Sequence, residues 1–200
     1  MGEVGSDSIL LGRSFFHRPT LQVARELLGA KLVRDYNGQQ IAGIIIETEA
    51  YIGKEDLGCH ASRGKTPRNE VMFGEAGRAY VYFTYGMHWL LNVVTEEVGF
   101  PAAVLIRAIQ PIQGVDLIAR TRGNVPRTQW TNGPAKLCQA LSIDGNFNGC
   151  DLCSPSSMLR IERGVTFTDD KVKTSARIGL FSVPQPWKDI PWRFYVSTLD

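Results

Sequence analysis

Two glutamates and a tyrosine, Glu47, Glu49 and Tyr51, follow three isoleucines at residues 44–46. Consecutive β-branched apolar residues are typical of a buried strand. Because the side chains of a strand return to the same face at every second residue, the two carboxylates and the ring are predicted to share a face. This pattern favours a carboxylate held on a rigid element beside a ring that can stack. The alternative is an edge strand whose polar end is solvated.

A single cation, Arg107, interrupts the apolar run of residues 102–109. Burying an isolated charge is very costly, so a cation in such a strand requires a carboxylate or a phosphate as partner. Glu49 is the predicted partner because it also ends a buried strand. A structural ion pair with Asp116 or Glu162 is the alternative.

Aromatic residues crowd the segment 79–95, which alternates like two strands, 79–84 and 87–95, joined at Tyr85 and Gly86. Tyr82 points to one face of this hairpin and would be an ordinary sheet residue in most proteins. A tyrosine at the tip of a turn has little core to enter, which favours an exposed contact or wedge residue at position 85.

The segment 52–77 is polar and rich in glycine, and it contains His60. A connection of this length in a compact domain is usually functional or disordered, and Thr66 with the following proline predicts a short ordered helix inside it. Rings at Tyr51, His60 and Tyr82 together with a base suit a planar substrate, such as a nucleobase extruded from a duplex.

The formal net charge of +2 neither requires nor excludes a nucleic-acid partner. Residues 101–140 carry five cations and one acid, which predicts either a phosphate-facing surface or a solvated face. Asn132 is predicted to cap a helix that starts near Pro134, with Lys136 beside its free N–H groups, and such a terminus can bind phosphate. Capping alone would also explain the asparagine and the proline. The five cations are Arg107, Arg120, Arg122, Arg127 and Lys136.

The four cysteines, Cys59, Cys138, Cys150 and Cys153, are predicted to be ordinary thiols. The spacing of the last two could suit a metal or a redox pair, but structural zinc needs four ligands and a second close pair is absent. The sequence contains no phosphate-binding P-loop, no dinucleotide-binding glycine motif and no Gly-x-Ser-x-Gly. We therefore expect neither a metal nor another cofactor.

The remaining pattern predicts one domain over residues 9–200, preceded by a frayed tail at residues 1–8. The polar N-terminus is unlike a signal peptide and no run is long enough to span a membrane, so an intracellular protein is expected. Thr20 is predicted to cap a helix whose buried face includes Leu21. The other expected elements are strands at 31–36 and 40–51 around the Asn37-Gly38 turn, a helix from Pro111 to Arg122, and closing strands at 158–162 and 193–197.

Five segments in order resemble the alkyladenine (3-methyladenine) DNA glycosylase family over nearly the whole chain, from about residue 9 to 196. The resemblance implies one α+β domain with a curved antiparallel sheet or open barrel, peripheral helices and a β-hairpin that enters the DNA minor groove. The segments are Glu47-Thr-Glu-Ala-Tyr51, Thr66-Pro-Arg-Asn69, Tyr80-Val-Tyr-Phe-Thr-Tyr-Gly-Met87, Leu105-Ile-Arg-Ala108 and Asn132-Gly-Pro-Ala-Lys-Leu-Cys-Gln-Ala-Leu141.

The resemblance also implies roles for individual residues. Glu49 would activate the attacking water, and Arg107 would help to hold that water and Glu49 and would keep the carboxylate ionised. An extruded base would lie between Tyr51 on one side and His60 with Tyr82 on the other. The further residues implied are Asn92 as a screen of purine edges, Tyr85 and Met87 as hairpin contacts with DNA, and Arg68 and Lys136 as phosphate contacts.

The expected reaction is hydrolysis of the N-glycosidic bond of an alkylated or deaminated purine, which leaves an abasic site. No motif places a lysine as a nucleophile, so strand cleavage is not expected. The expected partner is double-stranded DNA containing a damaged purine, and a monomer is adequate for this chemistry. Two alternatives remain, a nucleosidase that acts on free purine nucleosides and a non-catalytic binder of damaged DNA.

Overall fold

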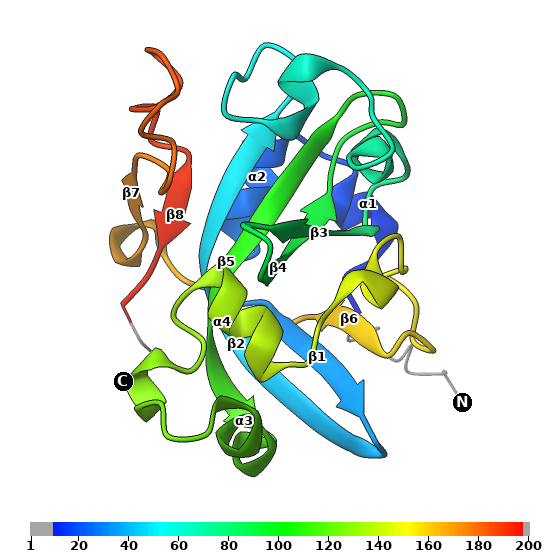
Figure 1. The fold of residues 1–200 in the computed structure, drawn as a ribbon, viewed down its shortest axis with the longest axis vertical. Helices are drawn as coiled ribbons and strands as arrows, with labels where there is room; N and C mark the ends of the chain where they lie inside the picture. Colours follow the sequence, from blue (N-terminus) through cyan, green and yellow to red (C-terminus); the bar gives the residue numbers. More distant parts are fainter. Residues whose placement is uncertain (1–9, 198–200) are drawn as a thin grey trace, which may run out of the picture.

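The computed structural model describes residues 10–197, so the predicted tail at residues 1–8 and the predicted start of the domain lie outside the described residues. The described chain is a single α+β domain built on an antiparallel sheet that does not close into a barrel, as the sequence predicted (Figure 1). The eight strands are β1 (Lys31–Tyr36), β2 (Gln39–Ile52), β3 (Ala79–Thr84), β4 (His88–Val94), β5 (Ala102–Gln113), β6 (Leu159–Glu162), β7 (Lys173–Ser175) and β8 (Arg193–Tyr195).

The 14-residue strand β2 is the centre of the sheet, whose main order is β3-β4-β5-β2-β1-β6. Its first half pairs with β1 and its second half with β8, while β5 runs along its other edge. The β1–β2 turn places Asn37 and Gly38 at positive φ values of 49° and 76°, the geometry that favours this dipeptide in tight hairpins. The predicted first hairpin is therefore confirmed.

The register between β2 and β5 is interrupted on both sides of Glu47. Ile45 pairs with Ile109 and Glu47 with Ala108, so β2 carries one extra residue there; Thr48 then pairs with Ile106, so Arg107 is an extra residue of β5. Bulges bend strands and change the direction in which side chains point. This irregularity lies beside the two carboxylates picked out from the sequence.

Helices pack on both sides of the long strands. In Figure 1, α2 (Thr20–Glu26) lies behind β2 and β5, and α4 (Pro134–Ala140) lies in front of them. Pro19, and not Thr20, is the residue before α2, and the Thr20 hydroxyl instead bonds to Thr95 and Glu96. The remaining helices are α1 (Arg13–Phe16) and α3 (Val115–Arg122).

Three other details of the prediction are wrong. Leu21 is exposed, so it does not share the buried face of α2. No helix begins at Pro111, because β5 continues to Gln113 and α3 starts only after Gly114, whose φ is +69°. Thr66 caps no helix; the nearby 3₁₀ helix starts at Glu70 with Asn69 before it.

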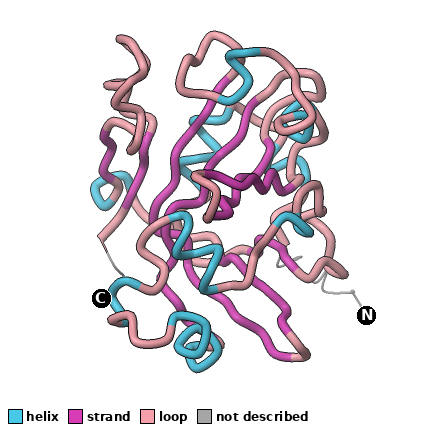
Figure 2. The backbone as a smooth tube through the Cα atoms, viewed as in Figure 1, coloured by secondary structure: helices cyan, strands magenta, loops and turns pink. Residues whose placement is uncertain are grey.

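Long connections form much of the outline of the molecule (Figure 2). The strands β6 and β8 confirm the predicted closing strands with shorter bounds, whereas β7 was not predicted. The described loops also contain short 3₁₀ helices at His60–Arg63, Glu70–Phe73, Arg127–Gln129, Gly145–Phe147 and Asp169–Lys171.

A fully buried ion pair joins two of these connections. Arg177 donates to both carboxylate oxygens of Asp56, at 2.6 and 2.8 Å, and neither side chain has exposed surface. Asp56 also accepts the backbone N–H groups of Ile52 and Gly58. The loop after β2 and the segment after β7 are thus held together by one charged contact.

Replacing Asp56 by alanine is expected to lower the free energy of unfolding by about 3–5 kcal/mol, because it leaves the Arg177 charge buried without its partner. Urea unfolding monitored by circular dichroism measures this loss. The matched control is Asp169→Ala, which removes the partner of Arg25 in a pair whose carboxylate is 98% exposed. Equal losses in the two variants would contradict the structural weight given to the buried pair.

Candidate active site

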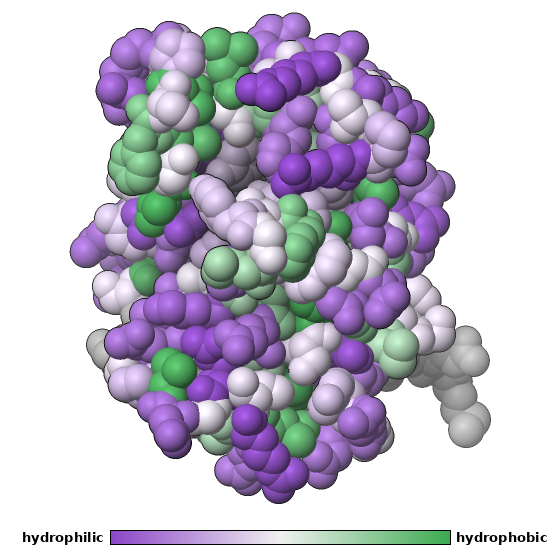
Figure 3. All heavy atoms as spheres, viewed as in Figure 1, coloured by the Kyte–Doolittle hydropathy of each residue, from purple (hydrophilic) through white to green (hydrophobic). Residues whose placement is uncertain are grey.

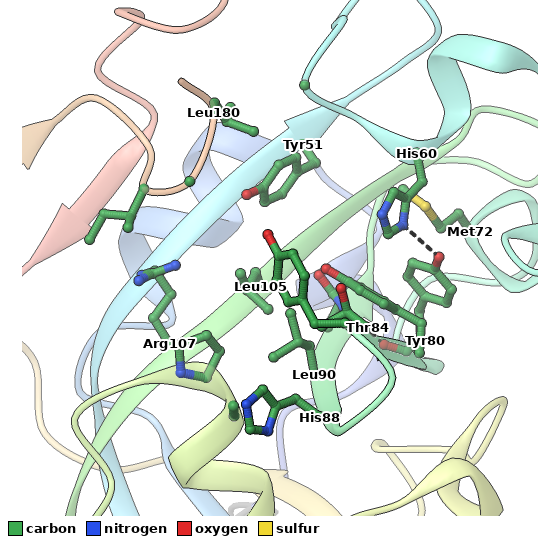
Figure 4. Close-up of a pocket in the computed structure, with 18 residues that line it drawn as sticks. Tyr51, His60, Met72, Tyr80, Thr84, His88, Leu90, Leu105, Arg107 and Leu180 are labelled. Atoms are coloured by element: carbon green, nitrogen blue, oxygen red, sulfur yellow. Dashed lines mark hydrogen bonds between the residues drawn. The ribbon is translucent and has the colours of Figure 1, made fainter. Parts of the chain in front are cut away.

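A cavity of about 350 Å³ opens beside the β3–β4 hairpin (Figure 4). Its volume lies within the range of small-molecule sites. Its walls come from β2, β3, β4 and β5, from the start of α4, and from residues 178–180. The same face of the molecule carries mostly polar side chains with small apolar areas between them (Figure 3).

Aromatic rings line two sides of this cavity. Tyr51 reaches it from β2, and His60 comes from the loop after β2, so that the two rings lie on either side of the space (Figure 4). The ring of Tyr82 packs edge-on against His60, with 4.5 Å between centroids. The structure therefore brings together the three rings that the sequence predicted to enclose a base.

His60 is held as a neutral ring. Burial, helped by the nearby Arg68 charge, lowers the pKa of His60 to about 4. Its Nδ1 lies 2.9 Å from the hydroxyl of Tyr80, a buried residue that also lines the cavity. A neutral imidazole offers a flat stacking surface at neutral pH without adding a positive charge to the cavity.

Glu49 lies directly behind the cavity wall and has no exposed surface. Its Oε2 accepts the Tyr51 hydroxyl at 2.8 Å and lies 3.2 Å from Nη1 of Arg107. Its Oε1 accepts the backbone N–H of Ile178 at 2.7 Å. All three partners line the cavity. The predicted Glu49–Arg107 pair is thus confirmed, and Arg107 also pairs with Glu47, at 2.7 Å.

The protonation of Glu49 reflects two opposed effects. Burial raises the pKa of Glu49 above its ordinary value, and this outweighs the lowering by Arg107 and by the N–H of Ile178. Arg107 does lower the pKa of Glu49, as expected from the sequence. The net shift is nevertheless upward, because the effect of burial is larger. The guanidinium of Arg107 loses solvation as well, yet the carboxylates of Glu49 and Glu47 raise its pKa overall.

The tip of the β3–β4 hairpin projects at the mouth of the cavity. Tyr85 is 84% exposed and Met87 is 68% exposed. Tyr85 and Gly86 have φ values of 52° and 67°, a turn geometry that favours Asn-Gly and disfavours tyrosine at its first position. An exposed aromatic residue in a costly backbone conformation points to a role outside folding.

The other predicted site residues surround the same cavity. Asn92 lines it and donates its side-chain amide to the backbone oxygen of Tyr80. Arg68 is exposed, donates to the backbone oxygen of Phe83 and lies over the ring of Tyr82. Lys136 lies on α4, whose first residues line the cavity, and it donates to Asn132.

The helix start near Lys136 differs from the prediction. Gly133, and not Asn132, precedes α4, and Asn132 makes no capping bond to the helix backbone. Its side-chain oxygen instead accepts the Lys136 ammonium at 2.9 Å. The free N–H groups of α4 and Lys136 are therefore near each other. Asn132 holds the lysine side chain and does not cap the helix.

Sequence reasoning missed the contributions that come from the last third of the chain. Ile178 bonds to Glu49, and Arg177 lies 4.7 Å behind the ring of Tyr51. Arg193 on β8 binds Glu47. Within residues 173–197 the sequence predicted only a closing strand at residues 193–197, which does not reveal what these residues contact.

The cysteines are free in the structure, in agreement with the predicted thiols. Burial raises the pKa of Cys150 and of Cys153 to about 11. Across residues 10–197, no three side chains of the metal-binding types gather closely enough to hold a metal ion. Within the same range, no helix has the length and apolar character that crossing a membrane requires.

The comparison with known proteins identifies the family of this chain. The sequence profile of a family described as "Methylpurine-DNA glycosylase (MPG)" matches residues 14–199. A protein of Carboxydothermus hydrogenoformans is 48% identical over 94% of this chain and 96% of its own length. One of Methanocella arvoryzae is 48% identical over 93% and 92%, and one of Desulfitobacterium hafniense is 46% identical over 94% and 95%. All three carry the name "Putative 3-methyladenine DNA glycosylase".

An open antiparallel sheet with a projecting hairpin, and a ring-lined cavity beside a buried carboxylate, thus occur in a chain of the DNA glycosylase class. The chain belongs to the methylpurine-DNA glycosylase family. The resemblance found in the five sequence segments is confirmed.

The ring of His60 is expected to stay neutral throughout the range in which an ordinary histidine gains a proton, because burial lowers its pKa to about 4. Two-dimensional NMR of the imidazole resonances between pH 3.5 and 8 measures the titration. Arg68→Gln should raise this pKa only part of the way towards its ordinary value, since the Arg68 charge is the smaller of the two causes. A midpoint near 6.5 in the unchanged protein would contradict the burial of this ring.

Proposed function

We propose that the protein extrudes alkylated or deaminated purines, of the 3-methyladenine type, from duplex DNA and hydrolyses their N-glycosidic bond with a water activated by Glu49. The product is an abasic site in an intact strand, and the reaction takes place inside the cell, where the DNA is. The observation that supports the proposal is the fully buried Glu49, whose partners Tyr51 and Arg107 form the wall of a cavity lined by rings.

The cavity provides stacking surfaces for a base. Extruding a nucleotide costs a few kcal/mol, and stacking on an aromatic ring returns about 1–3 kcal/mol per base. Tyr51 on one side and His60 with Tyr82 on the other can therefore offset extrusion. Asn92 lies in the same wall, where its side chain can discriminate among groups on the purine edge.

Glu49 has the properties of a general base. Cleavage of the N-glycosidic bond develops positive charge on the sugar, which an ionised carboxylate stabilises. Burial raises the pKa of Glu49, so its ionised form binds a proton more strongly than an exposed glutamate does. Stronger proton binding makes it a better base, as long as Arg107 keeps the ionised form populated.

Access to Glu49 requires one wall contact to open, because the carboxylate has no exposed surface in the structure. A water that replaces the Tyr51 hydroxyl at Oε2 would keep the number of hydrogen bonds constant and would lie beside Arg107. Contacts at catalytic groups often tighten or rearrange only when the substrate is bound. We therefore assign the water to this position between Glu49, Arg107 and the cavity.

The hairpin tip and two cations are assigned to the DNA around the extruded nucleotide. Tyr85 fills the gap that the base leaves in the duplex, with Met87 beside it, and both are exposed at the hairpin tip. Arg68 and Lys136 contact phosphates on either side of the cavity mouth. Counterions are released when cations bind phosphates, so affinity for DNA should fall as salt concentration rises.

Two other functions make different use of these residues. A nucleosidase needs Glu49 and the rings but gains nothing from an exposed tyrosine in a strained turn. A non-catalytic binder of damaged DNA gains nothing from a buried carboxylate that bonds to three groups of the cavity wall. The strained Tyr85 and the buried Glu49 therefore both favour the glycosylase.

The variant Glu49→Gln is expected to lower the rate of base release from methylated duplex DNA by about 10²- to 10⁴-fold, because the amide cannot accept the proton of the water. Binding of the same duplex should be largely unchanged. Single-turnover release of methylated purines and a fluorescence binding assay measure the two quantities. Glu97→Gln, which changes an exposed glutamate, is the matched control. A glutamine variant with the full rate would exclude Glu49 as the base.

The variant Tyr85→Asn is expected to lose base release from duplex DNA, whereas its activity on free methylated nucleoside should equal that of the unchanged protein. Asparagine suits the left-handed turn position better than tyrosine, so the hairpin itself should be no less stable. Met158→Ala, which removes another exposed apolar side chain, is the control. Unchanged activity on duplex DNA in the asparagine variant would contradict the wedge role.

A further inference from the structure

Two charged residues outside the cavity complete a chain of ion pairs that ends at Glu49. Oε1 of Glu47 accepts Nε of Arg107 at 2.7 Å and Nε of Arg193 at 2.7 Å. Arg107 in turn lies 3.2 Å from Glu49 through its Nη1. The order of charges is therefore Glu49, Arg107, Glu47 and Arg193, two negative and two positive.

Irregular pairing of β2 with β5 brings these four charged side chains close to the interior of the sheet. Arg107 is the extra residue of the β5 bulge, and Glu47 lies between the two register shifts of β2. Arg193 on β8 pairs in register with Glu49 from the other edge of β2. Exposure increases along the chain, from 0% for the side chain of Glu49 to 10% for Arg107, 16% for Glu47 and 19% for Arg193.

Arg107 is shared by two carboxylates, Glu47 and Glu49, and Arg193 supplies the second positive charge. One guanidinium shared by two carboxylates would leave a net negative charge in a poorly solvated place, where a carboxylate tends to take up a proton. Glu49 is the more buried of the two acids and would be the one that takes up the proton. Arg193 neutralises Glu47 from the far side, and Ser175 fixes Arg193 through its Nη1 at 2.8 Å.

We propose that Glu47 and Arg193 are positioning residues of the reaction: Glu47 aims Arg107 at the carboxylate and the water, and Arg193 balances Glu47 so that Glu49 remains ionised. Neither residue lines the cavity, so both act through Arg107. This inference rests on the proposed function, because it assigns their effect to the base of that reaction.

The ionisation of Glu49 depends on every group that faces it, and only one of these adds a further negative charge at neutral pH. Glu47 raises the pKa of Glu49, although burial is the largest cause of the upward shift. Removing Glu47 and removing Arg193 should therefore move this pKa in opposite directions. The groups around Glu49 are Glu47 and Tyr51 on β2, Tyr82 on β3, Arg107 on β5, Arg193 on β8, and Arg177 with the N–H of Ile178 after β7.

The test compares Arg193→Gln, Glu47→Gln and the double variant in single-turnover base release from methylated duplex DNA, measured from pH 4.5 to 9. The rate falls on the acid side when Glu49 takes up a proton. Arg193→Gln should move this acid limb to higher pH by about one unit, because an opposite charge is lost nearby. Glu47→Gln should move it to lower pH and also lower the plateau rate several-fold, because Arg107 loses its anchor.

The double variant restores a neutral Glu49–Arg107 pair, so its acid limb should return towards that of the unchanged protein. Arg193→Lys keeps the charge and should leave the limb in place, with KM for the duplex unaltered. A uniform loss of rate in both single variants without any movement of the limb would show a merely structural role and overturn the inference.

A second measurement keeps the inference independent of the reaction. The pKa of the Glu49 carboxyl, followed by carbon-13 NMR in protein labelled at its glutamates, should shift upwards in Arg193→Gln and downwards in Glu47→Gln. Circular dichroism confirms that each variant is folded. If the pKa of Glu49 shifts in opposite directions in the two variants but the protein releases no base, the charge chain stands and the proposed function is refuted. Base release that depends on Glu49, with equal titrations in all variants, would refute the charge chain alone.

Discussion

The structure depends on one carboxylate kept in the interior of a sheet. An isolated ionised group there would lose many kcal/mol of solvation, and proteins meet such a cost only with hydrogen bonds and opposite charge. Glu49 receives three such contacts, from Tyr51, Arg107 and the backbone of Ile178. These contacts come from three separate parts of the chain, and the sheet must bring all of them to one point.

The bulges of β2 and β5 follow from this constraint. In a regular ladder, each side chain has one partner directly across from it and its diagonal neighbours lie farther away. The extra residue at Arg107 lets one guanidinium reach both Glu47 and Glu49. The departure from regular pairing is thus the means by which the sheet supports a buried charge next to a cavity.

The chemistry of this site was easier to predict from the sequence than its environment. An arginine inside an apolar run demanded an acid, and a strand ending in Glu-Thr-Glu supplied one, so the Glu49–Arg107 pair followed from simple costs of burial. The turn at Asn37-Gly38 was predicted because few residues tolerate positive φ, and the tip at Tyr85 and Gly86 was predicted from the strand pattern on both sides of it. Hairpins are local in sequence, and their signals are therefore local as well.

The environment depends on contacts between residues far apart in the sequence, for which no local pattern exists. Arg193 and Glu47 are 146 residues apart, and Asp56 and Arg177 are 121 apart. The helix expected at Pro111 failed for the same reason, because pairing with β2 extends β5 past the proline and overrides local preference. The net pKa of Glu49 could not be predicted either, since burial is a property of the assembled fold.

Tyr51 connects the two halves of the proposed reaction. Its ring faces the cavity, its hydroxyl bonds to Glu49, and Arg177 lies behind it, held in turn by the buried Asp56. A nucleobase that stacks on this ring would contact the same side chain whose hydroxyl covers the Glu49 carboxylate. Under the proposed function, binding of the base and admission of the water would be one event, because Tyr51 takes part in both. An exposed glutamate would be open to water at all times, whereas under the proposed function Glu49, which Tyr51 covers, is reached only when a base occupies the cavity. In the proposed reaction, selectivity would depend on when Glu49 becomes accessible to water as well as on which nucleobases the cavity can bind.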